Sequence, residues 1–315
     1  MLPKATVIAV CVLIDDPKEF IARPFVISGM CKTEDYKAQY TLLSRASDAL
    51  IHSQKNSGRR LYCIATDGDS RWWHASALLT LTQNVEPASP IFITLSLLKL
   101  FSLKCGEDDL TMDFDWKHVL KHFCNTLLRQ HGILLNNTVI NIPILHKHLL
   151  THGLMESSMS SILAPNDRQD VTLMIQLLNS IAQLPEFAKP GEHPSSRASH
   201  RILWLLGQLY HNILEAFLRM TLSLHEQLTR LSTATHVMLA LYASYHGNFI
   251  PVQLFFDVMS MIKNVYMCVA KTQVNNLDGK FWVILLGTDG LEEVFGKVRT
   301  MVGNDTNADE LQLAN

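Results

Sequence analysis

The chain has 315 residues, of which 48% are hydrophobic and 18% charged, and its formal net charge is −2. This balance excludes an intrinsically disordered chain and provides side chains for a large core. It also gives no support for a dedicated basic DNA-binding domain, although a local basic face stays open. The six cysteines are scattered without a C-x-x-C pair, so we expect reduced thiols of an intracellular protein.

The first zone, residues 1–125, alternates predicted strands with predicted helices. This alternation is typical of the α/β class, with helices packed on a central sheet. The N-terminal apolar run is interpreted as a strand rather than a signal peptide, because it is β-branched and ends at two aspartates. The predicted strands are 5–14, 24–28, 61–66 and 110–114. The predicted helices are 34–54, 75–82, 92–103 and 116–130.

The second zone, residues 126–275, has a helical pattern almost throughout. In 201–231 the apolar residues recur at the spacing that lines one helix face. Another helix begins near 170, where Asp167 or Asp170 is the candidate N-cap. The segment AKPGEHPSS at 188–196 is the clearest linker. We expect no membrane span here, since the long apolar region 237–270 is interrupted by charges and a proline.

The third zone, residues 276–315, begins with a turn, NNLDG. The apolar FWVILL that follows predicts a buried strand or the start of a helix, and the sequence GTDG then interrupts the pattern. The segment 291–302, LEEVFGKVRTMV, predicts a helix with one apolar face.

Acidic residues stand at three abrupt transitions in this pattern. Asp67 and Asp69 follow a strand, Asp113 and Asp115 precede a helix, and Asp289, Glu292 and Glu293 stand where the last helix begins. Strand ends converge on one edge of a sheet, where loops build sites. Three carboxylates there are able to bind two Mg²⁺ ions roughly 3.5–4 Å apart and to support phosphodiester cleavage.

Each acidic position also has a purely structural interpretation, and these alternatives stay open. The sequence Asp67-Gly68-Asp69 is also typical of a turn. Asp115 is a natural N-cap for the helix that follows it. Glu292 and Glu293 favour the dipole of a helix N-terminus.

Two of these segments resemble motifs of P element-like and related cut-and-paste DNA transposases. DWKHVLKHFCNTLL at 115–128 resembles the motif D-x-x-H-L-x-K-x-x-R-N, with Cys124 where the family prefers Arg. DGLEEVFGKVRTMVG at 289–303 resembles D-x-L-E-x-x-F-x-x-x-R, which carries the last catalytic acid of that group. The overall style also resembles fungal transposase-like proteins.

The resemblance implies an RNase H-like α/β core with a central mixed sheet, interrupted by a large all-α insertion. The implied domains are 1–125, 126–275 and 276–315. Asp67, Asp115 and Glu292 would be the catalytic and metal-binding acids, with Asp69 and Glu293 as substitutes. The implied activity is hydrolysis of a DNA strand to a 3′-hydroxyl and attack of that hydroxyl on target DNA, with Mg²⁺ or Mn²⁺ as cofactor.

The resemblance also implies partners and a location. The DNA of element ends and target would be bound, and we expect a homo-oligomer in the nucleus with no membrane partner. The substrate-binding candidates are Lys117, His118, Lys121, Arg129 and Arg299. His118 and His122 have the spacing of two zinc ligands, but the H-E-x-x-H pattern and a third ligand are lacking, so zinc is not expected.

Two alternative functions are kept. One is a truncated or degenerate transposase copy that persists as a catalytically dead interaction protein, since the segment before Asp67 has no recognisable DNA-end-binding module. The other is a haloacid dehalogenase-like phosphatase, because an apolar strand followed by D-G-D-S resembles its aspartyl-phosphate motif. That alternative requires Asp67 beside Asp305 or Asp309.

Overall fold

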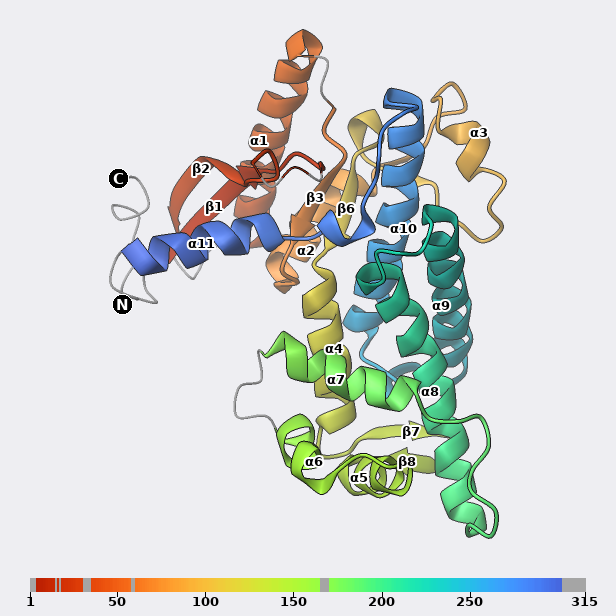
Figure 1. Cartoon of the computed structure of the whole chain (residues 1–315). Helices are drawn as coiled ribbons and strands as arrows, with labels where there is room; N and C mark the ends of the chain where they lie inside the picture. The colour runs from red at the N-terminus through yellow and green to blue at the C-terminus, as the bar shows by residue number, and fades with distance from the viewer. Residues whose placement is uncertain are drawn as a thin grey trace. The chain divides into compact units, whose positions relative to one another are not determined.

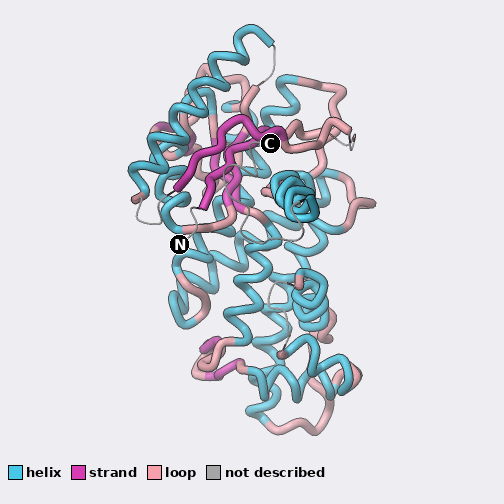
Figure 2. Tube along the Cα trace, turned by 90° about the vertical axis from the view of Figure 1, so that its left-hand side faces the viewer, coloured by secondary structure: helices cyan, strands magenta, loops and turns pink. Residues whose placement is uncertain are grey.

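The computed structural model describes residues 4–14, 16, 18–30, 35–57, 60–164 and 170–301. The fold is mixed α/β and mainly helical (Figure 1 and Figure 2). The chain divides into two compact units. Unit 1 combines Met1–Asp115 with Lys263–Asn315, and unit 2 is Trp116–Ile262. The domain boundaries expected at 125 and 275 stay a prediction.

The strands of unit 1 form hydrogen-bonded pairs. β1 and β2 are antiparallel, β3 and β6 are parallel, and β4 and β5 are antiparallel. The central mixed sheet that was predicted is therefore not one continuous ladder among the described residues, because β3 and β6 are short and pair only with each other. The strands of unit 1 are β1 Lys4–Val10, β2 Arg23–Met30, β3 Cys63–Thr66, β4 Gln83–Asn84, β5 Lys104–Cys105 and β6 Thr111–Phe114.

The helices of unit 1 follow the sequence pattern except in three places. The helix predicted at 75–82 begins earlier, at Ser70, and ends at Thr80. The helix predicted at 92–103 ends early, and Leu100 beyond it has a left-handed φ of 63°. The apolar FWVILL contains only a 3-10 turn instead of a strand or an α-helix. The helices are α1 Tyr36–Ser57, α2 Ser70–Thr80, α3 Phe92–Leu95, η1 Glu107–Asp109, η3 Val283–Leu285, α11 Asp289–Met301 and the second half of α10 Val252–Asn275.

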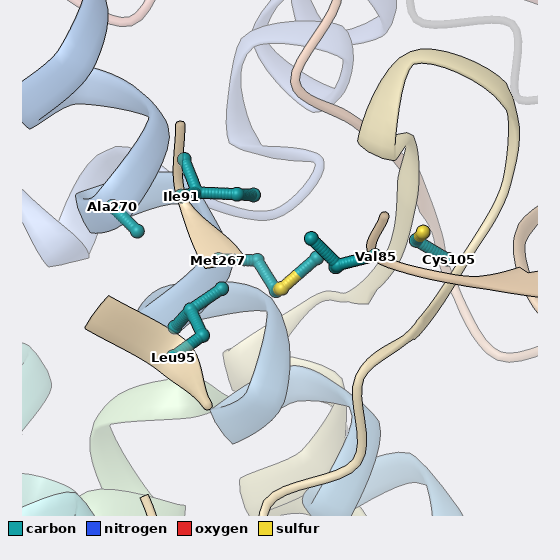
Figure 3. Packing of buried hydrophobic residues seen from close by; sticks show 6 residues of the cluster. All are labelled: Val85, Ile91, Leu95, Cys105, Met267 and Ala270. Atoms are coloured by element: carbon teal, nitrogen blue, oxygen red, sulfur yellow. The ribbon is translucent and has the colours of Figure 1, made fainter. Parts of the chain in front are cut away.

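A hydrophobic cluster holds α3 and the strands beside it against α10 (Figure 3). Met267 lies between the side chains contributed by the earlier segment, and it is fully buried. Phe101 and Tyr266 flank the cluster with ring centroids 5.8 Å apart. The residues of the cluster are Val85, Ile91, Leu95, Cys105, Met267 and Ala270.

Helix α10 is also fastened to β6 through buried polar groups. Thr111 Oγ1 donates to Asn264 Oδ1 at 2.6 Å, and Lys271 Nζ donates to the Tyr62 carbonyl at 2.6 Å. Lys271 has 0% exposure, and burial lowers the pKa of its ammonium group. α10 is long and apolar enough to cross a membrane by length and composition, and 61% of its apolar window is buried inside the protein.

Unit 2 is mainly helical and has one β-hairpin. α8 packs against both α7 and α9, and α7 also packs against α4. The hairpin turns at Asn136 and Asn137, both with positive φ, which suits the right-handed twist of two paired strands. Its elements are α4 Trp116–Leu128, β7 Ile133–Leu135, β8 Thr138–Ile140, α5 Ile142–Thr151, α6 Glu156–Leu163, α7 Val171–Ala182, α8 Pro194–Leu218, α9 Leu224–Tyr245, η2 His246–Asn248 and the first part of α10.

The helical pattern of 201–231 belongs to two helices rather than one. α8 ends at Leu218, and α9 begins after Ser223, whose side chain forms a capping box with Glu226. The linker predicted at 188–196 is shorter than expected, because α8 already begins at Pro194. Asp170 caps α7 by accepting from the Leu173 N–H at 3.0 Å, while the alternative cap lies outside the described residues.

Candidate metal centre

The parallel pair β3–β6 brings two of the predicted acids to one edge of unit 1. Thr66 pairs with Phe114 in the ladder, and the Asp115 N–H donates to the Thr66 carbonyl at 3.3 Å. Asp67 and Asp115 are therefore the first residues beyond two hydrogen-bonded strand ends, as the strand pattern of the sequence predicts.

Asp115 is fully buried, with 0% exposure. Its Oδ2 atom accepts two hydrogen bonds from Thr288, one from the backbone N–H and one from Oγ1, each 2.9 Å long. Thr288 directly precedes α11, so this contact joins the end of β6 to the helix that carries the last predicted acid. A buried carboxylate is costly without such donors.

Glu292 lies in the first turn of α11 and is exposed. Its backbone N–H donates to the Thr288 carbonyl at 3.0 Å. Asp115 and Glu292, which are far apart in the sequence, are thus both hydrogen-bonded to Thr288 within unit 1. A carboxylate in the first turn of a helix is also favoured by the helix dipole.

Asp115, His118 and Glu292 form a group that is able to hold a metal ion. Each offers one ligand atom, and these atoms lie within 4.8 Å of one another. His118 stands in the first turn of α4, three residues after Asp115, and is half-buried. Two carboxylates and one imidazole are a donor set that suits a divalent transition-metal ion such as Mn²⁺.

Asp67 does not belong to this group of three. Its side chain is exposed, and Oδ1 accepts a 3.3 Å hydrogen bond from the Asp69 N–H within its own turn. Gly68 between them has φ +91°, which favours glycine. The structure thus brings Asp115 and Glu292 together and leaves Asp67 at the neighbouring strand end.

Both of the substitute acids have structural partners. Asp69 caps α2 by accepting from the Arg71 N–H at 2.9 Å, and it forms a salt bridge of 2.9 Å with the Arg71 guanidinium. These contacts with Arg71 lower the pKa of Asp69. Glu293 forms an exposed ion pair of 2.8 Å with Lys297 in α11.

Asp113 lies in β6, two residues before Asp115, and is 1% exposed. Burial raises the pKa of its carboxyl group well above the usual range, and the nearby Cys63 thiol and Asp115 carboxylate add to this effect. Asp113 is not among the residues whose ligand atoms converge, so it is part of the buried strand β6 rather than of the metal-binding group.

The basic residues predicted to bind substrate lie mainly along or just after α4. Lys117 and Lys121 are half-buried, and the Lys117 ammonium lies 5.6 Å from the centroid of the Trp116 ring. Arg129 donates from Nε to the Gly132 carbonyl at 2.6 Å and so holds the turn after α4. The side chain of Arg299 lies outside the described residues. All four stay predictions as substrate-binding residues.

The comparisons with known proteins address the fold. No protein family and no curated protein matches this sequence. Among solved structures, the Drosophila P element transposase strand transfer complex is similar, with a TM-score of 0.56 and 14% sequence identity. The match covers 99% of this chain and 73% of the other.

The fold is transposase-like. This finding supports the expected transposase resemblance at the level of the fold, while the RNase H-like core and the three catalytic acids remain predictions. From the sequence, His118 is predicted to bind substrate rather than metal. The signal that could have indicated its position is the spacing Asp115-x-x-His118, which puts both residues on one face as a helix begins.

Proposed function

We propose that this protein is a metal-dependent enzyme that cleaves a DNA strand and transfers it, as a transposase does. The observation that carries the proposal is the convergence of Asp115, His118 and Glu292 in a chain with a transposase-like fold. The fold alone would not indicate the activity, because one fold hosts many functions. The acids that meet in this fold are those expected from the two sequence motifs.

The different exposure of Asp115 and Glu292 assigns each of them a different role in the proposed site. Asp115 is buried and oriented by Thr288, so it would provide a fixed ligand at the bottom of the site. Glu292 is exposed and would close the site from the solvent side, where a phosphodiester approaches. When bound, a divalent cation supplies Lewis-acid activation of the phosphodiester and of the attacking hydroxyl group.

Asp67 has a separate place in the proposal. It stands at the strand end beside Asp115 and is exposed, so its carboxylate has the freedom to turn toward a second cation. Two-metal sites need a ligand set on each side of the scissile phosphate. The proposed cofactor is therefore Mg²⁺ or Mn²⁺, with Asp67, Asp115 and Glu292 as the acidic ligands.

DNA is the proposed substrate and partner, contacted by Lys117, Lys121 and other basic side chains through its phosphates. Joining two element ends to one target requires two active sites, which favours a homo-oligomer. Such an enzyme would act in the nucleus of a eukaryotic cell, where its substrate lies.

Nicking of supercoiled plasmid by the full chain, with Mn²⁺ or Mg²⁺, tests the proposal. Asp115→Asn keeps the size of the side chain and an acceptor oxygen, and Glu292→Gln likewise changes only the charge. We expect each to lower the nicking rate at least about 100-fold, since a lost metal ligand removes several kcal/mol of transition-state stabilisation. Glu293→Gln is the matched control, because Glu293 is the next residue and pairs with Lys297 instead.

The outcomes separate the candidate functions. Equal nicking by wild type and Asp115→Asn would refute the proposed site. A wild-type protein that neither nicks DNA nor binds Mn²⁺ in calorimetry would indicate a catalytically dead interaction protein. Hydrolysis of a small phosphate monoester that depends on Asp67 but not on Glu292 would favour the phosphatase alternative instead.

A further inference from the structure

We infer that Thr288 is a positioning residue that sets Asp115 and Glu292 in the arrangement needed to bind a cation. The inference rests on the proposed function and assigns a role to a residue outside its ligand set. It starts from the Gly287-Thr288 pair, which precedes α11 and contacts Asp115 across 173 residues of sequence.

Thr288 holds Asp115 through two different donors. The backbone N–H and the Oγ1 hydroxyl both reach Oδ2 at 2.9 Å, so the carboxylate is held by a fork rather than by a single bond. Two bonds to one oxygen fix both its distance and the rotation of the carboxyl group. Hydrogen bonds from outside a metal-binding group orient its ligands in this way.

The same residue also fixes the start of the helix that carries Glu292. The Thr288 carbonyl accepts from the N–H groups of Leu291 at 2.9 Å and Glu292 at 3.0 Å. The hydroxyl hydrogen of Thr288 is donated to Asp115. One residue therefore couples the position of a strand-end acid to that of a helical acid.

Gly287 shows how closely this segment approaches the acid. Its φ is +108°, a backbone conformation that side chains rarely allow. A Cβ atom at Gly287 would lie 2.9 Å from Asp115 Oδ2 and 3.4 Å from Asp115 Cα. A larger residue at this position would strain the backbone and would require the Asp115 carboxylate to move.

Thr288→Val tests the inference, since it removes the hydroxyl while keeping the backbone N–H and the branched shape. We expect the dissociation constant for Mn²⁺, measured by calorimetry on the full chain, to rise about 10-fold, as is common when a supporting partner of a metal ligand is lost. Thr288→Ser should restore it to within about threefold. Gly287→Ala should weaken Mn²⁺ binding at least as much as Thr288→Val.

Thr272→Val is the matched control in the same unit. Thr272 Oγ1 donates to the Cys268 carbonyl inside α10, so its loss costs a hydroxyl hydrogen bond without touching either acid. We expect its Mn²⁺ affinity to equal that of wild type. Equal weakening in both variants would mean a general loss of structure and would overturn the positioning role.

A metal-free arm separates this inference from the proposed function. The melting temperatures of Thr288→Val, Asp115→Asn and the double variant form a double-mutant cycle. If the two side chains are in direct contact, the shift in the double variant differs from the sum of the two single shifts. Additive shifts would overturn the contact itself. Coupled shifts with unchanged Mn²⁺ affinity in Thr288→Val would overturn positioning. Coupled shifts in a wild type that binds no Mn²⁺ would refute the proposed function, and the positioning role with it.

Discussion

The N–H of Asp115 donates to the carbonyl oxygen of Thr66, so the ladder between β3 and β6 continues one step past the strands. This bond puts Asp115 level with Asp67 at the same edge of unit 1. The two acids nevertheless differ in exposure, because the side chain of Asp115 is buried and that of Asp67 is exposed. Their substitution should therefore have different consequences.

Asp67 and Asp69 offer a direct comparison of a proposed catalytic acid with a structural one. Asp67→Ala should change the free energy of unfolding by less than about 0.5 kcal/mol, because the side chain is exposed, and yet abolish metal-dependent nicking. Asp69→Ala should cost about 1 kcal/mol, since it removes the cap of α2, and leave nicking nearly unchanged. Urea denaturation and plasmid nicking on both variants check this, and a reversed pattern would exclude Asp67 from the site.

His118 should influence which metal ion is preferred. Imidazole suits transition metals, whereas Mg²⁺ prefers oxygen ligands. We expect His118→Gln to weaken Mn²⁺ binding about 10-fold while changing Mg²⁺ binding far less, as calorimetry with each ion would measure. His122→Gln is the control, because His122 lies one helical turn further along α4 and is outside the metal-binding group. Equal losses for both ions would contradict the preference for Mn²⁺ that is attributed to the imidazole.

Gly207 in α8 approaches α7 so closely that its substitution should reverse the usual effect of alanine in a helix. Alanine has a helix propensity better than glycine by about 1 kcal/mol. At Gly207, however, a Cβ atom would lie 2.5 Å from the Ile181 carbonyl oxygen. Overpacking of this kind costs about 1–3 kcal/mol, so Gly207→Ala should lower the free energy of unfolding.

Gly296 supplies the control for that prediction. It lies in α11 with open space where a Cβ atom would be placed, and it is exposed. Gly296→Ala should therefore stabilise the protein by about 0.5–1 kcal/mol. Thermal unfolding of the two variants, compared with wild type, tests whether Gly207→Ala destabilises the protein and Gly296→Ala stabilises it. If both substitutions stabilised the protein, α7 and α8 would not approach as closely as described.

Unit 2 should lose stability in mild acid through His148. This side chain is 1% exposed with Nε2 2.8 Å from Ser199 Oγ, and burial lowers its pKa to about 4. The unfolded chain takes up a proton near pH 6.5, where the native state does not. The contribution of His148 is thus complete above pH 6.5 and is lost as the pH falls toward 4, by about 3 kcal/mol at most.

Urea denaturation between pH 7.5 and 4.5 measures this slope. His148→Gln removes the titrating group and should flatten it, whereas His236→Gln, at an exposed position in α9, should not. The same slope in wild type and His148→Gln would assign the acid sensitivity to other groups.

The sequence was informative where an apolar run ended at a charged residue. The ends of β3 and β6 and the start of α4 were predictable because Asp67 and Asp115 interrupt hydrophobic segments. The break between α8 and α9 was missed although its signal was present, since Ser223 and Glu226 have the spacing of a capping box.

Other features have no local signal. The meeting of Asp115 with Thr288 depends on the path of the chain through the whole of unit 2. The 3-10 turn within FWVILL was also unpredictable from local sequence. A short apolar run is compatible with a strand or a helix, and its tertiary contacts decide which forms. The prediction that Asp115 and Glu292 belong to one site came from the resemblance of their segments to family motifs. The periodicity of hydrophobic residues carries no information about this pairing.

The contact between Asp115 and Thr288 has a consequence for the order in which the molecule forms. Closing a flexible loop of 173 residues costs about 4–5 kcal/mol of chain entropy. Unit 2 lies inside that loop and has its own core, so its folding shortens the loop before the closing contact is made. On the ribosome, α11 is also the last described element to emerge. The two acids therefore meet only after α11 has been synthesised, and a nascent chain that ends before α11 carries no assembled cation site.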